Sequence, residues 1–223
     1  VFLTILVILH HTMIIYAASG NWSLYMEGRQ DEITKALGGW FCATNQAYFM
    51  SLFLLISAYF VPGSYDRKGA GYFLKDRLIR LGIPLIIYSW IISPLTWVVV
   101  IYVTQGQILP WWRYLPGVGE SVIGAGPLWF VEVLLIFSLV YVLWRRFFRP
   151  SPPVPPVETE SRFPGNIAIV LFALLTGVGA FVVRLWMPVG ESFSLLNLQV
   201  PFFVLYIAMF IVGLIAYRRN WLL

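Results

Sequence analysis

Six long apolar stretches dominate this chain, and each is close to the length that a helix needs to cross a lipid bilayer. They cover residues 1–18, 40–61, 82–103, 127–147, 166–187 and 198–217. A hydrocarbon core of about 30 Å takes roughly 20 helical residues. Because lipid offers no water to backbone N–H and C=O groups, such stretches have to form helices, or pieces buried among helices. The sequence therefore predicts an all-α, polytopic transmembrane bundle with these six spans.

The composition agrees with this prediction and excludes an ordinary soluble globule. Hydrophobic residues make up 60% of the chain and charged residues 11%, against about a quarter charged residues in soluble domains. The formal net charge is +5, but the basic residues lie in short stretches between apolar runs, which does not suit nucleic-acid binding. The single cysteine, Cys42, allows no intrachain disulfide, and no residues have metal-ligand spacing. We expect the lipid bilayer as a partner, no nucleic acid, no metal and no bound cofactor.

The positive charges predict the orientation of the chain in a cell membrane. Eleven of the 15 Lys and Arg residues lie at or beyond the far ends of the second, fourth and sixth spans, and four lie at or beyond those of the first, third and fifth. Since Lys and Arg accumulate in cytosolic loops, we expect the first residue and the loops 63–81 and 148–165 in the cytosol. The proline-rich segment 149–165 is predicted to be a semi-rigid linker, or alternatively a ligand for a proline-binding domain.

Polar residues occur inside three of the predicted spans at similar depths. His10 and His11 lie about 10 to 12 Å below the outer end of the first span, and Asn45, Gln46 and Glu132 lie about 8 Å inside theirs. An ionisable side chain at mid-helix costs about 2.5 to 3.5 kcal/mol, so such residues are functional candidates. The shared depth predicts one buried polar site, with a histidine and a carboxylate suited to general-base catalysis. The alternative is that His and Glu only join neighbouring helices.

Adjacent residues point about 100° apart on a helix, so we expect only one histidine of the pair to face this site.

Arg77 and Arg80 are candidates for a second site, near the inner end of the third span. Their i, i+3 spacing places both on one face of an α-helix. Pro84 has no N–H for the carbonyl of Arg80, which predicts a kink and a polar notch. Two guanidinium groups there suit a phosphorylated ligand arriving from the cytosol. The alternative is that they are topology signals that reach lipid headgroups.

Four segments of the chain resemble the membrane-bound acyltransferase 3 family, whose members are integral membrane O-acyltransferases acting on sugars, peptidoglycan, glucans and other acceptors. The segments are residues 7–11 (VILHH), 53–60 (FLLISAYF), 73–84 (FLKDRLIRLGIP) and 126–135 (GPLWFVEVLL). They occur in the family's order and cover nearly the whole chain. The family's architecture of about ten spans implies that this chain corresponds to the first six. It also implies that the family's first-span arginine lies before Val1.

The resemblance implies roles for several residues. The family histidine maps to His10 or His11, and the spacing favours His11. In members of the family, acyl-CoA approaches an arginine pair on the cytosolic side, and the resemblance assigns this role to Arg77 and Arg80. Trp129 belongs to the family's Leu-Trp-Phe signature, and Pro127 stands where many members have histidine.

Residues and resemblance together give one hypothesis of function. An acyl group, with acetyl expected, moves from cytosolic acyl-CoA to a hydroxyl of an extracytoplasmic or membrane-associated acceptor such as a carbohydrate. The candidate catalytic residues are His11, His10 and Glu132, the acyl-CoA site is Arg77 and Arg80, and the acceptor or oxyanion residues are Asn45, Gln46 and Trp129. The alternatives are a transporter or flippase that binds a solute or proton in the same layer, and a chain that is inactive without further parts.

Overall fold

The computed structural model describes residues 1–18, 21–22, 25–26, 31–116, 125–148, 163–191 and 198–221. Helices make up most of these residues, so the predicted all-α class is confirmed. The chain divides into two compact units, Val1–Leu54 and Leu55–Leu223, which are described in turn. The predicted linker 149–165 lies, up to residue 162, outside the described residues.

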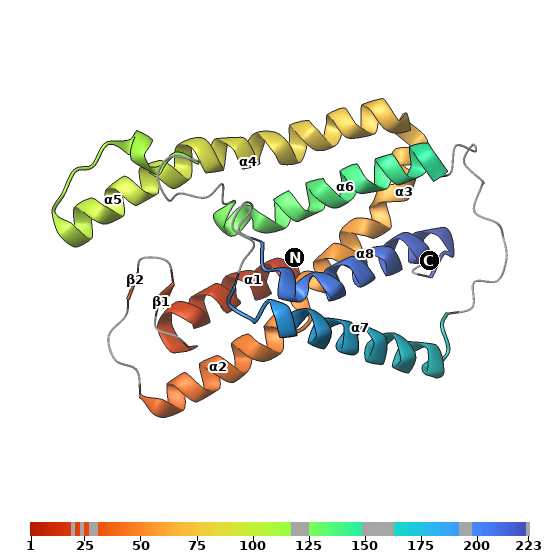
Figure 1. The fold of residues 1–223 in the computed structure, drawn as a ribbon, viewed down its shortest axis with the longest axis horizontal. Helices are drawn as coiled ribbons and strands as arrows, with labels where there is room; N and C mark the ends of the chain where they lie inside the picture. The colour runs from red at the N-terminus through yellow and green to blue at the C-terminus, as the bar shows by residue number, and fades with distance from the viewer. Residues whose placement is uncertain are drawn as a thin grey trace. The chain divides into compact units, whose positions relative to one another are not determined.

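The first unit contains two packed helices and the beginning of a third (Figure 1). Helix α1 (Phe2–Met13) continues as the π-helix η1 (Ile14–Ala18). A two-stranded antiparallel pair follows, β1 (Asn21–Trp22) and β2 (Tyr25–Met26). Helix α2 (Glu32–Gln46) packs against α1 and η1. Asp31 caps α2 by accepting hydrogen bonds from the backbone N–H groups of Ile33 and Thr34, which satisfies donors that have no partner within the helix.

A turn at Ala47–Tyr48 interrupts the second predicted span between α2 and α3 (Phe49–Arg77). The N–H of Ala47 bonds to the carbonyl of Thr44, and that of Tyr48 to the carbonyl of Asn45, over 3.2 Å in each case. Both bonds span three residues instead of four, so the chain tightens there. The interruption follows directly after Asn45 and Gln46, two of the polar residues that the sequence singled out.

The second unit contains the rest of a helical run that extends over 74 residues, from Glu32 to Gln105. A straight helix of this length would measure about 110 Å, several times the thickness of a bilayer. The run is broken at Gly69, whose φ of 74° lies in the left-handed region. Figure 1 shows the change of direction between the orange part of α3 and the yellow helices after it.

Two proline-associated π turns interrupt the second half of this run. The elements are η2 (Leu78–Gly82), α4 (Ile83–Ile87), η3 (Tyr88–Ile92) and α5 (Ser93–Gln105). Pro84 and Pro94 each follow a π turn, and the residue before each proline bonds to the carbonyl five residues earlier, Ile83 to Leu78 and Ser93 to Tyr88. Because proline lacks an N–H, the regular hydrogen-bond pattern has to change near it. The distortion predicted at Pro84 is present, as a π turn.

The remaining elements of the second unit are η4 (Trp111–Tyr114), η5 (Gly126–Leu128), α6 (Trp129–Phe148), α7 (Asn166–Trp186), η6 (Val200–Phe202) and α8 (Phe203–Arg218). Helix α8 approaches α3 closely at Gly213. A Cβ there would overlap the carbonyl oxygen of Leu55 and come within 2.7 Å of the Cβ of Ala58. Small residues at such a crossing let two helix backbones approach each other, as in many membrane helix pairs.

All six predicted spans are helical, although their limits differ from those expected. Four runs in the described residues are long and apolar enough to cross a membrane: Glu32–Gln105, Gly126–Phe148, Asn166–Trp186 and Val200–Arg218. The first of these contains two predicted spans, and the first predicted span is the shorter apolar helix Phe2–Ala17. The segment 63–81, expected as a loop, is largely helical. Gly69 is the residue with non-helical φ and ψ inside α3, and the cytosolic position of the segment stays a prediction.

Candidate functional site

His10 is the buried member of the histidine pair in the first unit. Its relative exposure is 5%, and its ring stacks on Phe49 with 4.8 Å between the ring centroids. The ring of His11 meets it edge-on at 5.5 Å. On the side of α2, the thiol of Cys42 donates to the backbone carbonyl of His10 over 3.8 Å. The imidazole of His10 therefore lies between α1 and the first residues of α3.

His11 is half-buried, and its geometry defines its tautomer. Its Nδ1 lies 2.8 Å from the carbonyl oxygen of Val7, one turn earlier in α1. A backbone carbonyl can only accept a hydrogen bond, so Nδ1 has to carry the proton. In the neutral ring the lone pair is then on Nε2. His11 is thus oriented by its own helix with Nε2 as the basic atom.

Asn45 is buried against α1, with an exposure of 2%. Its Nδ2 donates to the carbonyl oxygen of Leu6 over 3.5 Å. This contact fixes the orientation of the amide, since the other orientation would place two oxygens together. Gln46, the last residue of α2, is half-buried beside the Ala47–Tyr48 turn.

Glu132 and Trp129 lie one turn apart at the beginning of α6, in the second unit. Glu132 is buried, and its Oε2 has no hydrogen-bond partner among the described residues. A carboxylate in the first turn of a helix is favoured by the helix dipole. The indole of Trp129 stacks on the buried Tyr206 of α8, with centroids 5.7 Å apart. Trp129 thereby joins α6 to α8 next to the carboxylate.

The structure brings together some of the predicted site residues. His10 and His11 contact each other, and Asn45 contacts the same helix at Leu6, within the first unit; Glu132 and Trp129 lie one turn apart on α6 in the second. The predicted single layer contains residues of both units. Since each unit is described by itself, the meeting of His11 with Glu132 stays a prediction.

Arg77 and Arg80 have different surroundings, although the sequence placed them as a pair. Arg77 is half-buried, with its guanidinium 5.1 Å from the centre of the Phe73 ring and no partner for its Nε among the described residues. The side chain of Arg80 is 72% exposed, and its Nε lies 2.8 Å from a carboxylate oxygen of Asp76. The other oxygen of Asp76 accepts from Lys68, also at 2.8 Å. The π turn η2 begins between the two arginines, so the shared face expected of an α-helix does not follow here.

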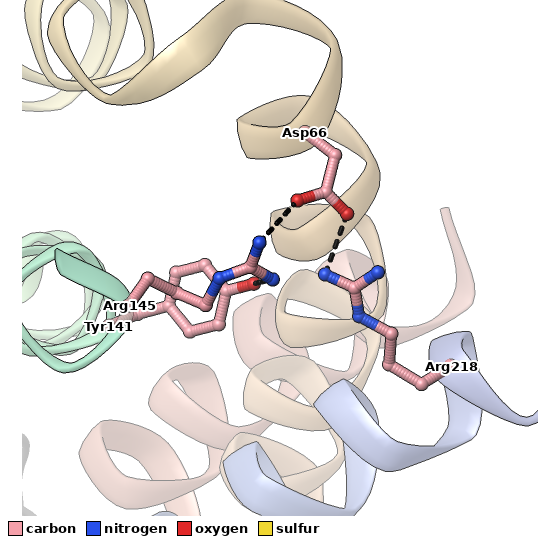
Figure 2. Close-up of polar contacts among 4 residues, drawn as sticks. All are labelled: Asp66, Tyr141, Arg145 and Arg218. Carbon is pink, nitrogen blue, oxygen red and sulfur yellow. Dashed lines mark hydrogen bonds and ion pairs between the residues drawn. The ribbon is translucent and has the colours of Figure 1, made fainter. Parts of the chain in front are cut away.

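A buried ionic cluster that sequence analysis missed joins three helices of the second unit (Figure 2). Asp66 of α3 bonds Arg145 of α6 at 3.0 Å and Arg218 of α8 at 2.6 Å, one arginine on each carboxylate oxygen. Arg145 also donates to the hydroxyl of Tyr141 at 3.3 Å, and its guanidinium lies 5.1 Å from the centre of the Tyr65 ring. The side chains of Asp66 and Arg145 are only 14% and 10% exposed.

The sequence contains a signal for this cluster. Arg145 and Arg218 lie at the ends of two apolar stretches. Asp66 is an acidic residue in a strongly basic segment near the end of an apolar stretch. A carboxylate at such a place needs a cationic partner if it is buried, and the arginines ending two other apolar helices were the available partners.

No group of three or more His, Cys, Asp or Glu side chains that could hold a metal ion occurs in the parts of the chain that the structure describes. The first unit contains an oriented imidazole, that of His11, in contact with the buried ring of His10. Such an imidazole can take a proton from a hydroxyl and return it to a leaving group.

A family model described as "Acyltransferase domain" matches the chain over residues 1–223. No curated protein and no solved structure matches it.

Proposed function

Because the chain belongs to the acyltransferase 3 family, we propose that it moves an acyl group, with acetyl the expected one, from cytosolic acyl-CoA to a hydroxyl group. The acceptor lies on the opposite side of the membrane or within it, and a carbohydrate is the acceptor class we favour. Family membership supports acyl transfer in general. The donor, the acceptor and the residues below are our proposal.

The contact between His11 and Val7 carries the proposal. With Nδ1 bonded to the Val7 carbonyl at 2.8 Å, the imidazole is held in the tautomer whose Nε2 accepts a proton. This is the role that a backbone carbonyl or carboxylate has beside many catalytic and metal-binding histidines. His11 is therefore our candidate for the general base, and His10 contacts it edge-on.

The reaction balances with one histidine. Nε2 of His11 takes the proton of the acceptor hydroxyl while the oxygen attacks the thioester carbonyl carbon. The C–S bond then breaks, the proton passes from His11 to the departing thiolate, and the products are an ester and free coenzyme A. Amide groups such as that of Gln46 suit the negative charge on the carbonyl oxygen during this step.

Two other groups of residues complete the proposal. Glu132 would orient the imidazolium or balance its positive charge. Trp129 would form part of the acceptor site beside it. Arg77 and Arg80 would bind the phosphates of acyl-CoA, since guanidinium groups pair well with phosphate oxygens. We place these arginines on the cytosolic side because basic residues concentrate in that segment of the sequence.

The test is acyl transfer by the wild type, His11→Ala and His10→Ala in proteoliposomes supplied with radiolabelled acetyl-CoA and a carbohydrate acceptor. Covalent label on the acceptor distinguishes an acyltransferase from a transporter, which moves a solute without forming a bond. Loss of a general base should lower kcat by about 10² to 10⁴-fold in His11→Ala. Activity retained in both alanine variants would remove the catalytic role of the pair.

A further inference from the structure

Two buried polar atoms of the first unit have no hydrogen-bond partner among the described residues. They are Nδ1 of His10 and Oδ1 of Asn45, on side chains whose residues are 5% and 2% exposed. A buried polar atom without a partner costs free energy comparable to a lost hydrogen bond. Two such atoms close together would be explained by one molecule that binds both.

The contacts of the two residues place them at the same level of α1. Asn45 bonds the carbonyl of Leu6, which precedes His10 by one helical turn. Side chains on a helix lean toward its N-terminus, so the His10 ring lies over the turn that contains Leu6. The same ring stacks on Phe49, four residues after Asn45. His10 and Asn45 therefore both lie at the contact between α1 and the α2–α3 junction.

The junction of α2 and α3 at Ala47–Tyr48 is a tightened turn of helix. Ala47 keeps helical φ and ψ, −65° and −26°, so the two helices continue one another. The turn separates Asn45 from Phe49, the two residues that meet α1 at this level.

The chemistry of the two atoms limits what they can bind. Since Nδ2 of Asn45 is held by Leu6, its Oδ1 is left as an acceptor and requires a donor on the ligand. An ionised carboxylate or phosphate has no donor to offer. An alcohol has one donor and two acceptor lone pairs, so it can donate to Oδ1 of Asn45 and, when the neutral His10 ring carries its proton on Nδ1, also accept from that N–H.

We propose that His10 and Asn45 form a binding site for an alcohol, and that this site holds the hydroxyl of the acceptor next to His11. The inference rests on the proposed acyl transfer and assigns the two residues a separate function. His10 positions the acceptor, and His11 removes its proton.

Two substitutions of His10 test the site. One keeps the shape of the ring and removes its hydrogen bonding, and the other keeps a hydrogen-bonding nitrogen and removes the ring. His10→Phe keeps a ring that stacks on Phe49 but has no ring nitrogen. His10→Asn has an amide nitrogen two bonds from Cβ, as Nδ1 is in histidine. Both variants are assayed in proteoliposomes with radiolabelled acetyl-CoA and methyl α-D-glucopyranoside, a soluble carbohydrate with free hydroxyl groups.

We expect His10→Phe to raise KM for the glucoside by about tenfold, while KM for acetyl-CoA changes by less than about twofold. His10→Asn should keep KM for the glucoside within about threefold of the wild type. Equal KM values for the glucoside in wild type and His10→Phe would overturn the site, as would a His10→Asn variant no better than His10→Phe.

A binding measurement keeps this inference separate from the proposed function. The ring nitrogens of histidine are followed by NMR while the wild type is titrated with the glucoside. The Nδ1 resonance of His10, identified by its absence in His10→Phe, should shift. A shift without acyl transfer would support the alcohol site and contradict the proposed function. Acyl transfer without a shift would mean that His10 and Asn45 hold only water. This result would overturn the alcohol site and leave the proposed acyl transfer standing. The absence of both would overturn the two together.

Discussion

Nη2 of Arg218 lies 2.6 Å from Oδ2 of Asp66, which joins the last turn of α8 to α3. The same carboxylate binds Arg145 of α6 through its other oxygen (Figure 2). Since neither Asp66 nor Arg145 is more than 14% exposed on its side chain, water screens this cluster little. Removing the carboxylate would leave a buried guanidinium without a counter-charge, which is much more costly than breaking a surface pair.

Asp66→Asn should therefore lower the free energy of unfolding by about 3 kcal/mol, measured by thermal or denaturant unfolding in detergent. The matched control is Asp76→Asn, because Asp76 also binds two cations, Lys68 and Arg80, but its side chain is 28% exposed. We expect the control to lose much less free energy of unfolding than Asp66→Asn, because water screens its ion pairs. An equal or larger loss in the control would contradict the view that Asp66 holds α3, α6 and α8 together.

Gly213→Ala tests the close approach of α8 to α3. The new Cβ would meet the carbonyl of Leu55, a backbone atom that cannot rotate away. We expect a loss of about 1 to 3 kcal/mol in the free energy of unfolding. Gly177→Ala in α7 is the control, since nothing lies within 4 Å of a Cβ there, and it should stabilise by about 0.5 to 1 kcal/mol. Two variants of equal stability would mean that α8 and α3 are not in contact at Gly213.

Asp31 makes the beginning of α2 sensitive to acid. The hydrogen bond from the Thr34 hydroxyl, together with backbone N–H donors, lowers the pKa of the Asp31 carboxyl below its ordinary value of 3.8. Because the pKa of Asp31 is lower in the folded state than in the unfolded state, the cap stabilises α2 fully at pH values above the pKa of the unfolded state. This stabilisation is lost as the pH falls through the pKa of the folded state. Hydrogen exchange at the Ile33 and Thr34 amides should therefore accelerate, after correction for intrinsic rates, only below about pH 4.

Asp31→Asn is the control for the acid effect, because asparagine also caps helices but does not titrate in this range. The protection of the two amides should be independent of pH in this variant. Thr34→Val, which lacks the hydroxyl donor, should move the transition to higher pH. An identical pH profile in all three proteins would exclude Asp31 as the titrating group.

Arg77 and Arg80 should contribute unequally to donor binding. The Arg80 guanidinium is already paired with Asp76, whereas the Nε of Arg77 has no partner among the described residues. We expect Arg77→Gln to raise KM for acetyl-CoA by about tenfold and Arg80→Gln by about threefold. Steady-state kinetics with acetyl-CoA varied would measure both values. A larger effect at Arg80 would mean that acyl-CoA displaces Asp76 and binds there.

Helix positions in this protein are local properties of the sequence, and they could be predicted. A run of about 20 apolar residues has to be helical in lipid whatever surrounds it, because its backbone groups have no other partners. This is why all six predicted spans are helical, and why Pro84, which lacks an N–H, marks a distortion. The exception is the segment 63–81, where one glycine turns the chain and the helix otherwise continues.

The partners of polar side chains were decided by the tertiary structure. Nothing in the adjacent His10 and His11 shows which one is buried, because the answer depends on Phe49 from another helix. Asp66 meets Arg145 and Arg218 across 79 and 152 positions of the sequence. Hydrophobic length acts within one segment, whereas an ion pair or a buried amide depends on which helices pack together and in what register.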